Sequence, residues 1–284
     1  MPTVGLVIKR RAPSARSTAR GVCEWLRGEG IGVVAEHEDA AVLGVASCSK
    51  VEMFASADAI VVLGGDGTFL ATARHAGARE VPIVGVNLGA LGFLTEVATG
   101  EIREAVRATL EGRAAIDRRR MIRAAIRPGD GPEEVHQALN DAVLSRGSLG
   151  RVVDIEASVD GVFLAVFKAD GLIVATPTGS TAYSLSAGGP IVHPAVGVLV
   201  LSPICPHTLS VRPLVVDDGV RLEFRLRSRR ERLLLTLDGR ETIELTERDS
   251  VEVTRSPHVA CLVRSPSLGF YDLLRTKLGW ARRS

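Results

Sequence analysis

The first 112 residues alternate short apolar runs with segments of helical spacing, and this alternation constrains the fold more than any other feature of the chain. The apolar runs have the length of buried strands: Val4–Ile8, Ile31–Glu36, Ala59–Leu63 and Val81–Val86. The segments with helical spacing are Ser17–Gly28, Thr68–Ala78 and Glu101–Gly112. Strands that alternate with helices predict a parallel sheet with helices on its faces, and such sheets bind ligands beyond the carboxyl ends of their strands.

The pattern changes after Arg120, where the apolar segments become shorter, β-branched and separated by turn signals as far as about Val263. The turn signals are the pairs Asp160-Gly161, Asp170-Gly171 and Asp238-Gly239. Short segments joined by such turns are typical of antiparallel sheets. The first strand-length segments of this region are Met121–Arg127, Gln137–Ser145, Val152–Val159 and Val162–Lys168.

These patterns predict two domains. Residues 1–118 form an α/β domain with a Rossmann-like parallel sheet, and a C-terminal helix within residues 267–284 returns to it. Residues 119–266 form an antiparallel β domain. The helical spacing of Leu268–Trp280 supports the C-terminal helix. With 284 residues and 46% hydrophobic content, the chain can bury a substantial core.

The charge balance argues against a polyanionic partner. The formal net charge is only +2, from 35 Lys and Arg against 33 Asp and Glu, so we do not expect the chain to bind nucleic acid through counterion release. Three basic runs are interpreted as solvated loops or strand ends: Lys9–Arg11, Arg118–Arg120 and Arg227–Arg230.

The sequence favours a cytosolic location. The N-terminal apolar stretch is short and is followed, not preceded, by positive charge, unlike a signal peptide. No apolar run approaches the length of a membrane span, so no membrane partner is expected. The four cysteines lie far apart without a Cys-x-x-Cys pair, which supports neither disulfides nor a zinc site: Cys23, Cys48, Cys205 and Cys261.

The sharpest motif is Gly64-Gly65-Asp66-Gly67-Thr68, at the point where the Ala59–Leu63 strand gives way to a helix. Its glycines let the backbone approach a ligand closely, and the helix that follows presents free N–H groups to phosphate oxygens. Gly64, Gly65, Gly67 and Thr68 are therefore candidate phosphate-binding residues. The motif is neither a P-loop nor the Gly-x-Gly-x-x-Gly dinucleotide fingerprint.

Three further segments carry polar groups or glycines at strand ends. Gly85–Leu94 is a glycine-rich connection that contains Phe93, and Asn140-Asp141 places an amide beside a carboxylate. Asp170–Pro190 combines an acid, a hydroxyl-rich loop and the aromatic ring of Tyr183. Hydroxyl and amide groups can bind ribose and adenine edges, and an aromatic ring offers a stacking face.

The glycine-aspartate motif resembles the one shared by NAD kinases, diacylglycerol and sphingosine kinases, and phosphofructokinases. Taken in order, the four segments are similar to the NAD kinase family, and the resemblance continues through Pro206–Val215 to Lys277–Trp280. It implies transfer of the terminal phosphoryl group of ATP to the 2'-hydroxyl of the adenosine ribose of NAD, giving NADP.

The resemblance also implies the organisation of the enzyme. The second domain would be β-sandwich-like and would bind NAD, and the NAD sites of a homodimer or homotetramer would lie between domains and subunits. The cofactor would be Mg²⁺ or another divalent cation. We expect no metal-ligand cluster in the protein, because Mg²⁺ commonly keeps its waters and binds chiefly through substrate phosphates.

Site residues are carried over position by position. Asp66 matches the proton acceptor of the family, Asn140 and Asp141 match a pair that binds NAD, and Asp170 matches an acid near the nicotinamide. The full set assigned to NAD is Asp66, Gly67, Phe93, Asn140, Asp141, Arg151, Lys168, Asp170, Thr181, Ala182, Tyr183, Ser184, Leu185, Ser186 and Arg240. Many relatives carry Glu at the position of Asp141 and Arg at that of Lys168, which shortens one carboxylate and replaces a planar fork by a point charge.

Three other functions share part of this pattern. A lipid kinase would need an apolar groove or a basic amphipathic helix, and a sugar-phosphate kinase would need basic residues beside the acceptor. An NADP sensor without catalysis would keep the pocket but not the turnover. The sequence leaves open the use of polyphosphate, acceptance of NADH, inhibition by NADPH or NADH, and the subunit number.

Overall fold

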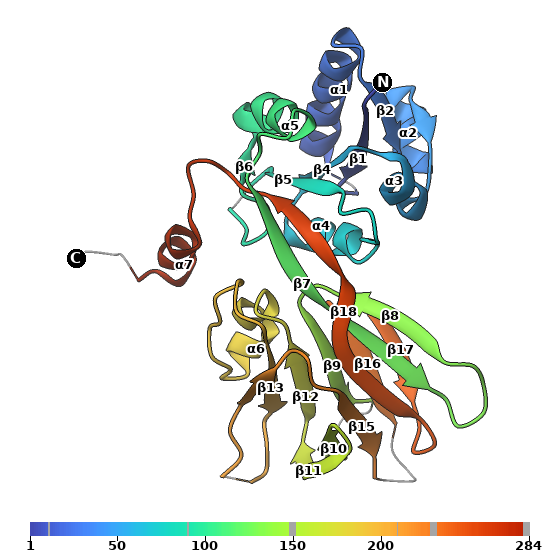
Figure 1. The fold of residues 1–284 in the computed structure, drawn as a ribbon, viewed down its shortest axis with the longest axis vertical. Coiled ribbons are helices and arrows are strands. Elements are labelled where there is room, and N and C mark those ends of the chain that lie inside the picture. Colours follow the sequence, from blue (N-terminus) through green and yellow to red (C-terminus); the bar gives the residue numbers. More distant parts are fainter. Residues whose placement is uncertain (11, 90, 148–151, 209, 228–231, 281–284) are drawn as a thin grey trace. The chain divides into compact units, whose positions relative to one another are not determined.

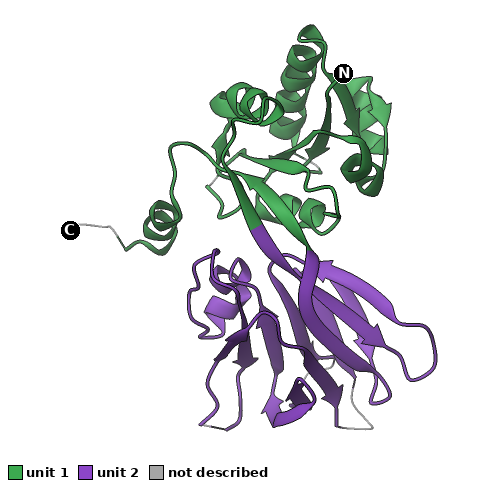
Figure 2. Ribbon diagram, viewed as in Figure 1, with its two compact units in different colours: residues 1–118, 258–284 green, residues 119–257 purple. Residues whose placement is uncertain are grey.

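The computed structural model describes residues 1–10, 12–89, 91–147, 152–208, 210–227 and 232–280. The chain divides into two compact units, coloured separately in Figure 2. Unit 1 comprises residues 1–118 and 258–284, and unit 2 comprises residues 119–257.

The centre of unit 1 is a parallel sheet with the strand order β5-β4-β1-β2-β3, and β6 pairs with β5 (Figure 1). The bounds are β1 (Thr3–Ile8), β2 (Gly32–Ala35), β3 (Ala46–Ser47), β4 (Ala59–Gly64), β5 (Pro82–Asn87) and β6 (Val97–Ala98). All six residues of β4 are buried, as expected of a parallel strand that is covered on both faces.

Unit 1 also contains helices. They are α1 (Pro13–Gly28), α2 (His37–Leu43), α3 (Lys50–Ser56), α4 (Asp66–Ala73), the short 3₁₀ helix η1 (Thr99–Glu101), α5 (Ile102–Leu110) and α7 (Phe270–Leu278). The apolar face of α1 recurs at helical spacing and is buried: Ala15, Ala19, Val22, Cys23 and Leu26. No described helix is both long and apolar enough to cross a membrane.

Unit 2 is a sandwich of two antiparallel sheets. One contains β11-β10-β15-β18 with β7 and β8 beyond β18, and the other has the order β14-β13-β12-β9-β16-β17. The bounds are β7 (Ile116–Arg127), β8 (Glu134–Ala138), β9 (Asp141–Arg146), β10 (Val153–Val159), β11 (Val162–Ala169), β12 (Gly171–Ala175), β13 (Val198–Ile204), β14 (Leu214–Asp217), β15 (Leu222–Leu226), β16 (Leu233–Leu237), β17 (Glu241–Leu245) and β18 (Ser250–Val263). The 3₁₀ helix η2 (Gly179–Thr181) and helix α6 (Tyr183–Ser186) follow β12.

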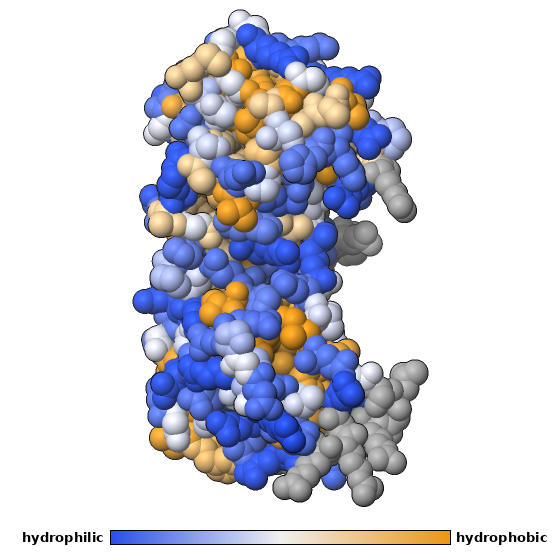
Figure 3. All heavy atoms as spheres, turned by 90° about the vertical axis from the view of Figure 1, so that its right-hand side faces the viewer, coloured by the Kyte–Doolittle hydropathy of each residue, from blue (hydrophilic) through white to orange (hydrophobic). Residues whose placement is uncertain are grey.

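Alternate residues of the strands fill the core between these sheets. Val153, Ile155 and Ala157 of β10 are buried, as are Leu233 and Leu235 of β16. This period of two places one face of each strand in the core. On the face of the molecule in Figure 3, apolar residues lie in separate patches among hydrophilic ones.

The predicted fold class is confirmed: a parallel sheet with helices is followed by an antiparallel sheet domain. Two helices between β2 and β4 had not been predicted, although Ser49 and Glu52 form a capping box at the start of α3. The structure places residues 258–266 in unit 1, whereas the expected boundary put them in the β domain. The reason is that the end of β18 pairs in parallel with β5, Cys261 with Pro82 and Leu262 with Ile83.

The segment Gln137–Ser145 had been expected as one strand with Asn140 on it, and this was wrong. It forms the end of β8 and most of β9, separated by a bend at Leu139 and Asn140. Asp141 is the first residue of β9.

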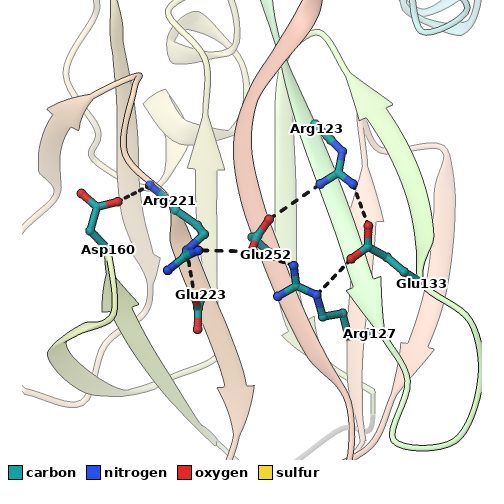
Figure 4. A network of polar contacts seen from close by, with 7 residues as sticks. All are labelled: Arg123, Arg127, Glu133, Asp160, Arg221, Glu223 and Glu252. Atoms are coloured by element: carbon teal, nitrogen blue, oxygen red, sulfur yellow. Dashed lines mark hydrogen bonds and ion pairs between the residues drawn. The ribbon is translucent and has the colours of Figure 1, made fainter.

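An ion network lies on unit 2 around Glu252 (Figure 4). The side chain of Glu252 is only 10% exposed, and its oxygens lie 3.0 Å from Arg127 Nη2, 3.7 Å from Arg123 Nη1 and 3.9 Å from Arg221 Nε. The carboxylate of Glu133 also binds two of these arginines, with Oε1 2.7 Å from Arg123 Nη2 and Oε2 2.9 Å from Arg127 Nε. One largely buried carboxylate therefore interacts with two guanidinium groups from β7 and with that of Arg221, which directly precedes β15.

Replacement of Glu252 by Gln is expected to lower the free energy of unfolding by about 1–3 kcal/mol, because three arginines lose a charged acceptor. Urea unfolding measures this loss. The control is Asp130→Asn, since Asp130 and Arg248 form an ion pair whose side chains are 89% and 72% exposed. That change should stay within about 0.5 kcal/mol. Equal losses in both variants would contradict a special role for Glu252.

Candidate functional site

The glycine-aspartate turn lies where β4 ends and α4 begins. Gly64 is the last residue of β4, Gly65 precedes the helix, and Asp66 is its first residue. A Cβ on Gly64 would lie 2.7 Å from Thr68 Oγ1, so a larger residue does not fit. The predicted position of this motif at the carboxyl edge of the parallel sheet agrees with the structure.

The carboxylate of Asp66 is bound to the Phe93–Thr95 segment. Oδ2 accepts the N–H of Phe93 at 2.8 Å. Oδ1 accepts the N–H groups of Leu94 at 3.0 Å and Thr95 at 3.2 Å, and the hydroxyl of Thr95 at 3.1 Å. A carboxylate oxygen offers about two lone-pair sites, so the described contacts saturate Oδ1 and leave Oδ2 able to accept another donor.

Gly92 makes this arrangement possible. A Cβ on Gly92 would lie 2.0 Å from Asp66 Oδ1 and 2.5 Å from Thr95 Oγ1, far inside van der Waals contact. The half-buried Phe93 follows, and the ammonium group of Lys277 on α7 lies 6.0 Å from the centroid of its ring. The glycine-rich connection after β5 thus holds Asp66 through backbone groups.

A cavity of about 220 Å³ lies at the carboxyl ends of β1, β4 and β5. It is lined by Lys9, Ala12, Ser14, Gly64, Gly65, Asn87, Leu88 and Gly89. A lysine, a serine and a glycine turn beside a helix start can bind phosphate oxygens. Lys9 had been interpreted as part of a solvated basic run. Its position directly after the first buried strand could have identified it, since neighbouring parallel strands end at one edge.

Unit 2 contains a second cavity, of about 390 Å³. It is lined by Asn140, Asp141, Val143, Ser145, Ala182, Tyr183, Thr236, Asp238 and Gly239. Its described lining has two carboxylates, one amide, two aliphatic hydroxyls and an aromatic residue, but no Lys or Arg. Such a lining suits a nucleoside, whose ribose donates hydrogen bonds and whose base stacks, better than it suits a phosphate.

The bend that precedes Asp141 is held from two sides. The N–H of Thr176 donates to the carbonyl of Asn140 at 2.8 Å, and the Thr176 hydroxyl donates to that of Leu139 at 2.6 Å. A Cβ on Gly179 would lie 2.0 Å from the carbonyl oxygen of Asn140. On the other side, the carboxylate of Asp238 accepts hydrogen bonds from residues 139 to 141.

The carboxyl group of Asp141 is almost completely buried. The residue is only 4% exposed, and no described group hydrogen-bonds to its carboxylate. Burial, and then the negative charge of Asp238, raises the pKa of Asp141 to about 7. The carboxyl group is therefore available to a ligand and changes charge near neutral pH.

The other predicted residues divide into two groups. Asn140, Asp141, Ala182 and Tyr183 line the second cavity together, and Tyr183 is 47% exposed. The remaining unit 2 candidates do not line it: Lys168, Asp170, Thr181, Ser184, Leu185, Ser186 and Arg240. Arg151 lies outside the described residues. Asp238, which had been noted only as a turn residue, lines the cavity.

Several of these residues have other partners. The carboxylate of Asp170 lies 3.0 Å from Arg146 Nη1, and the buried hydroxyl of Ser184 lies 2.9 Å from that of Ser202. Thr181 donates to the carbonyl of Thr178 at 3.2 Å. Lys168 and Arg240 are exposed.

Among the described residues, no group of three or more His, Cys, Asp and Glu could hold a metal ion.

A glycine-lined cavity at the carboxyl edge of a parallel sheet, with an antiparallel domain in the same chain, is typical of a nucleotide-binding enzyme. Residues 4–114 match the family model of the ATP-NAD kinase N-terminal domain, and residues 139–265 match that of the ATP-NAD kinase C-terminal domain. The chain belongs to the NAD kinase family.

Relatives of similar sequence agree with this assignment, and solved structures share the fold. The NAD kinases of Geobacter metallireducens and Citrifermentans bemidjiense are 44% and 43% identical over 283 and 288 residues, covering 100% of both chains in each comparison. The yeast NADH kinase crystallised with NADH is 25% identical with a TM-score of 0.93, covering 100% of this chain and 89% of that one. The Archaeoglobus fulgidus NAD kinase crystallised with ATP shares the fold at 23% identity and a TM-score of 0.77, covering 98% and 99%.

Replacement of Gly92 by Ala is expected to displace the Asp66 carboxylate, because the new methyl group would lie against Oδ1. Since the sequence predicts Asp66 as the proton acceptor, turnover should fall by about 10²–10⁴, the range for loss of a positioned base. Steady-state NADP formation measures the loss. The matched control is Gly100→Ala, whose Cβ would meet nothing within 4 Å. Normal turnover in the Gly92 variant would show that the position of Asp66 does not control the reaction.

Proposed function

We propose that this protein transfers the terminal phosphoryl group of ATP to the 2'-hydroxyl of the adenosine ribose of NAD and so produces NADP. The observation that carries the proposal is the carboxylate of Asp66. Four hydrogen bonds hold it at the start of α4, Oδ2 can accept a further donor, and the preceding Gly64 and Gly65 line the cavity that suits phosphate.

The cavity of unit 1 is proposed as the site of the ATP phosphates. Lys9 supplies a positive charge, while Ser14 and the backbone of the glycine turn supply neutral donors. Since no described cluster of carboxylates or histidines could bind a metal, a divalent cation fits this protein only if the phosphates and water provide most of its ligands. When bound, Mg²⁺ would neutralise part of the phosphate charge.

The cavity of unit 2 is proposed as the site of the adenosine part of NAD. Asp141 and Asn140 would bind ribose hydroxyl groups, and Tyr183 would stack on the base. The described lining contains no basic residue, which argues against a sugar phosphate as acceptor. Its carboxylates, amide and hydroxyls likewise argue against a lipid acceptor.

Asp66 would act as the base. The ribose 2'-oxygen attacks the γ-phosphorus in line with the departing oxygen of ADP, the bond from that oxygen to phosphorus breaks, and the hydroxyl proton moves to Oδ2. Oδ1 stays bound to Leu94 and Thr95 and fixes the direction of Oδ2. Because the transition state is loose, most of the rate enhancement comes from positioning the two substrates.

Two further parts of the proposal concern the cellular location and the subunit number of the enzyme. We place it in the cytosol, which the absence of a disulfide among its four described cysteines supports. We also propose a homodimer or homotetramer, as the family resemblance implies. Sedimentation velocity of the purified protein distinguishes these states from a monomer.

The direct test incubates the purified protein with Mg²⁺, ATP and separate acceptors: NAD, NADH, diacylglycerol, sphingosine and fructose 6-phosphate. Mass spectrometry identifies the phosphorylated acceptor, and the position of the new phosphate is read from ³¹P-¹H couplings. We expect NADP phosphorylated at the 2'-oxygen. Phosphorylation of a lipid or sugar instead of the dinucleotides, or tight NADP binding without turnover, would overturn the proposal.

Asp66→Asn should keep the affinity for NAD but lose about 10²–10⁴ of turnover. The amide oxygen can still accept the Leu94 and Thr95 donors, but the NH2 group in the place of Oδ2 can accept neither the proton nor the N–H of Phe93. Calorimetric NAD binding and steady-state rates separate the two effects. Unchanged turnover removes Asp66 from the role of base.

Lys9→Met should raise the KM for ATP by about 10- to 100-fold and leave the KM for NAD unchanged, because a charged phosphate contact is lost. Lys50→Met is the control. Lys50 is the first residue of α3, lies outside the cavity and forms an ion pair with Glu36. A parallel rise of both KM values for the Lys9 variant would argue against a donor-specific role.

A further inference from the structure

The turn between β16 and β17 has an unusual backbone. Asp238 has a φ of 50° and Gly239 one of 64°, so both are left-handed. They are the central residues of the turn in which the N–H of Arg240 donates to the carbonyl of Leu237 at 3.0 Å. A left-handed conformation is uncommon for a residue other than glycine and costs free energy unless its surroundings compensate. The contacts of the Asp238 side chain supply that compensation.

The carboxylate of Asp238 binds three consecutive backbone N–H groups. Oδ2 accepts that of Leu139 at 3.0 Å, and Oδ1 accepts those of Asn140 at 2.7 Å and Asp141 at 3.2 Å. The N–H of Asp238 donates in return to the carbonyl of Asp141 at 3.0 Å. These donors lie at the break between β8 and β9, so the carboxylate takes the place of a neighbouring strand there.

The break has a consequence for the cavity. Successive side chains of a regular strand point to opposite faces of the sheet, which would separate Asn140 from Asp141. In the structure both residues line the same cavity, together with Asp238 itself. The bend at Leu139 and Asn140 allows this, and Asp238 binds every N–H of the bend.

We propose that Asp238 is a positioning residue for NAD: by gathering the N–H groups of residues 139–141, it holds the Asn140-Asp141 pair against one ligand. The inference rests on the proposed function, because it assigns the acceptor to the unit 2 cavity. Asp238 lies in the turn between β16 and β17, 99 positions after Leu139, whose N–H it binds.

The charge of Asp238 adds a second effect. The titratable groups that line the cavity are Asp141, Asp238 and Tyr183 of α6, and the residue opposite Asp141 on β12 is the uncharged Ala175. The negative charge of Asp238 disfavours ionisation of Asp141 and helps to raise its pKa to about 7. Below that pH Asp141 is neutral, and above it the ionised carboxylate accepts hydrogen bonds from ribose hydroxyls. Removal of the charge at position 238 therefore lowers the pKa of Asp141.

The chain offers a matched control in a second hairpin turn. Asp160 also has a φ of 50°, precedes Gly161 with a φ of 79°, and accepts the N–H of Arg221 at 2.9 Å (Figure 4). It does not line the cavity. Asp→Asn at either turn keeps the size of the side chain and suits a left-handed backbone, but only the change at Asp238 affects the bend.

The experiment compares Asp238→Asn and Asp160→Asn with the unaltered protein. For Asp238→Asn we expect the KM for NAD to rise by about 10- to 100-fold, while kcat and the KM for ATP stay within about threefold. The profile of kcat/KM for NAD against pH reports groups of the free enzyme. Its midpoint near pH 7 should move to lower pH in Asp238→Asn and stay in place in Asp160→Asn. A parallel rise of both KM values, an unmoved midpoint, or the same effects in both variants would overturn the proposal.

A second measurement uses the unaltered protein, in case Asp238→Asn does not fold. Amide hydrogen exchange by NMR should show protected N–H groups at residues 139–141, although 139 and 140 lie outside the strand ladder. Rapid exchange at these three positions would overturn the inference. These amide data do not depend on turnover, so they still test the role of Asp238 if the substrate panel shows that NAD is not the acceptor.

Discussion

The four hydrogen bonds to the carboxylate of Asp66 are the interaction on which the rest of the site depends. They join the turn after β4 to the connection after β5, two segments separated by 27–29 positions in the sequence. Gly92 permits the close approach, and backbone N–H groups provide three of the four donors. A carboxylate that is fixed in this way needs no reorganisation when a hydroxyl group approaches its remaining lone pair.

The two cavities differ in the charge of the residues that line them. The cavity with Lys9 and the glycine turn stabilises negative charge, whereas the one with Asp141 and Asp238 carries negative charge and has no basic residue in its described lining. The described lining of the second offers no cation to a phosphate group, and a neutral nucleoside would gain little from the first. On our proposal, the donor and the acceptor therefore bind in cavities whose lining residues differ in charge.

The sequence predicted the fold class well, because apolar runs that alternate with helical spacing indicate a parallel sheet and because short β-branched segments with turn signals indicate an antiparallel one. Asp160-Gly161 and Asp238-Gly239 do join hairpins, whereas Asp170-Gly171 connects strands of different sheets. It also predicted where the glycine-aspartate turn lies, since glycines that follow a fully apolar run mark the end of a buried strand. Lys9 and Asp238 were missed as candidate site residues for a common reason. A basic run and an Asp-Gly turn have ordinary local explanations, and their other role arises from contacts with distant segments, 97–99 positions away for Asp238. The strand expected across Asn140 failed for the same reason, since the acceptor that bends it lies on another hairpin.

The long strand β18 has a consequence for the order in which the protein can be completed during its synthesis. Residues 119–257 form a unit inserted into another, and the last residues of β18 pair with β5 in the sheet of that other unit. When the ribosome has made the start of β5, the partner of Pro82 there, Cys261, is still more than 170 residues away in the sequence. Domains usually fold in turn as they emerge. Here the inserted sandwich can close first, and the parallel sheet gains the end of β18 only after residues 119–257 have been made.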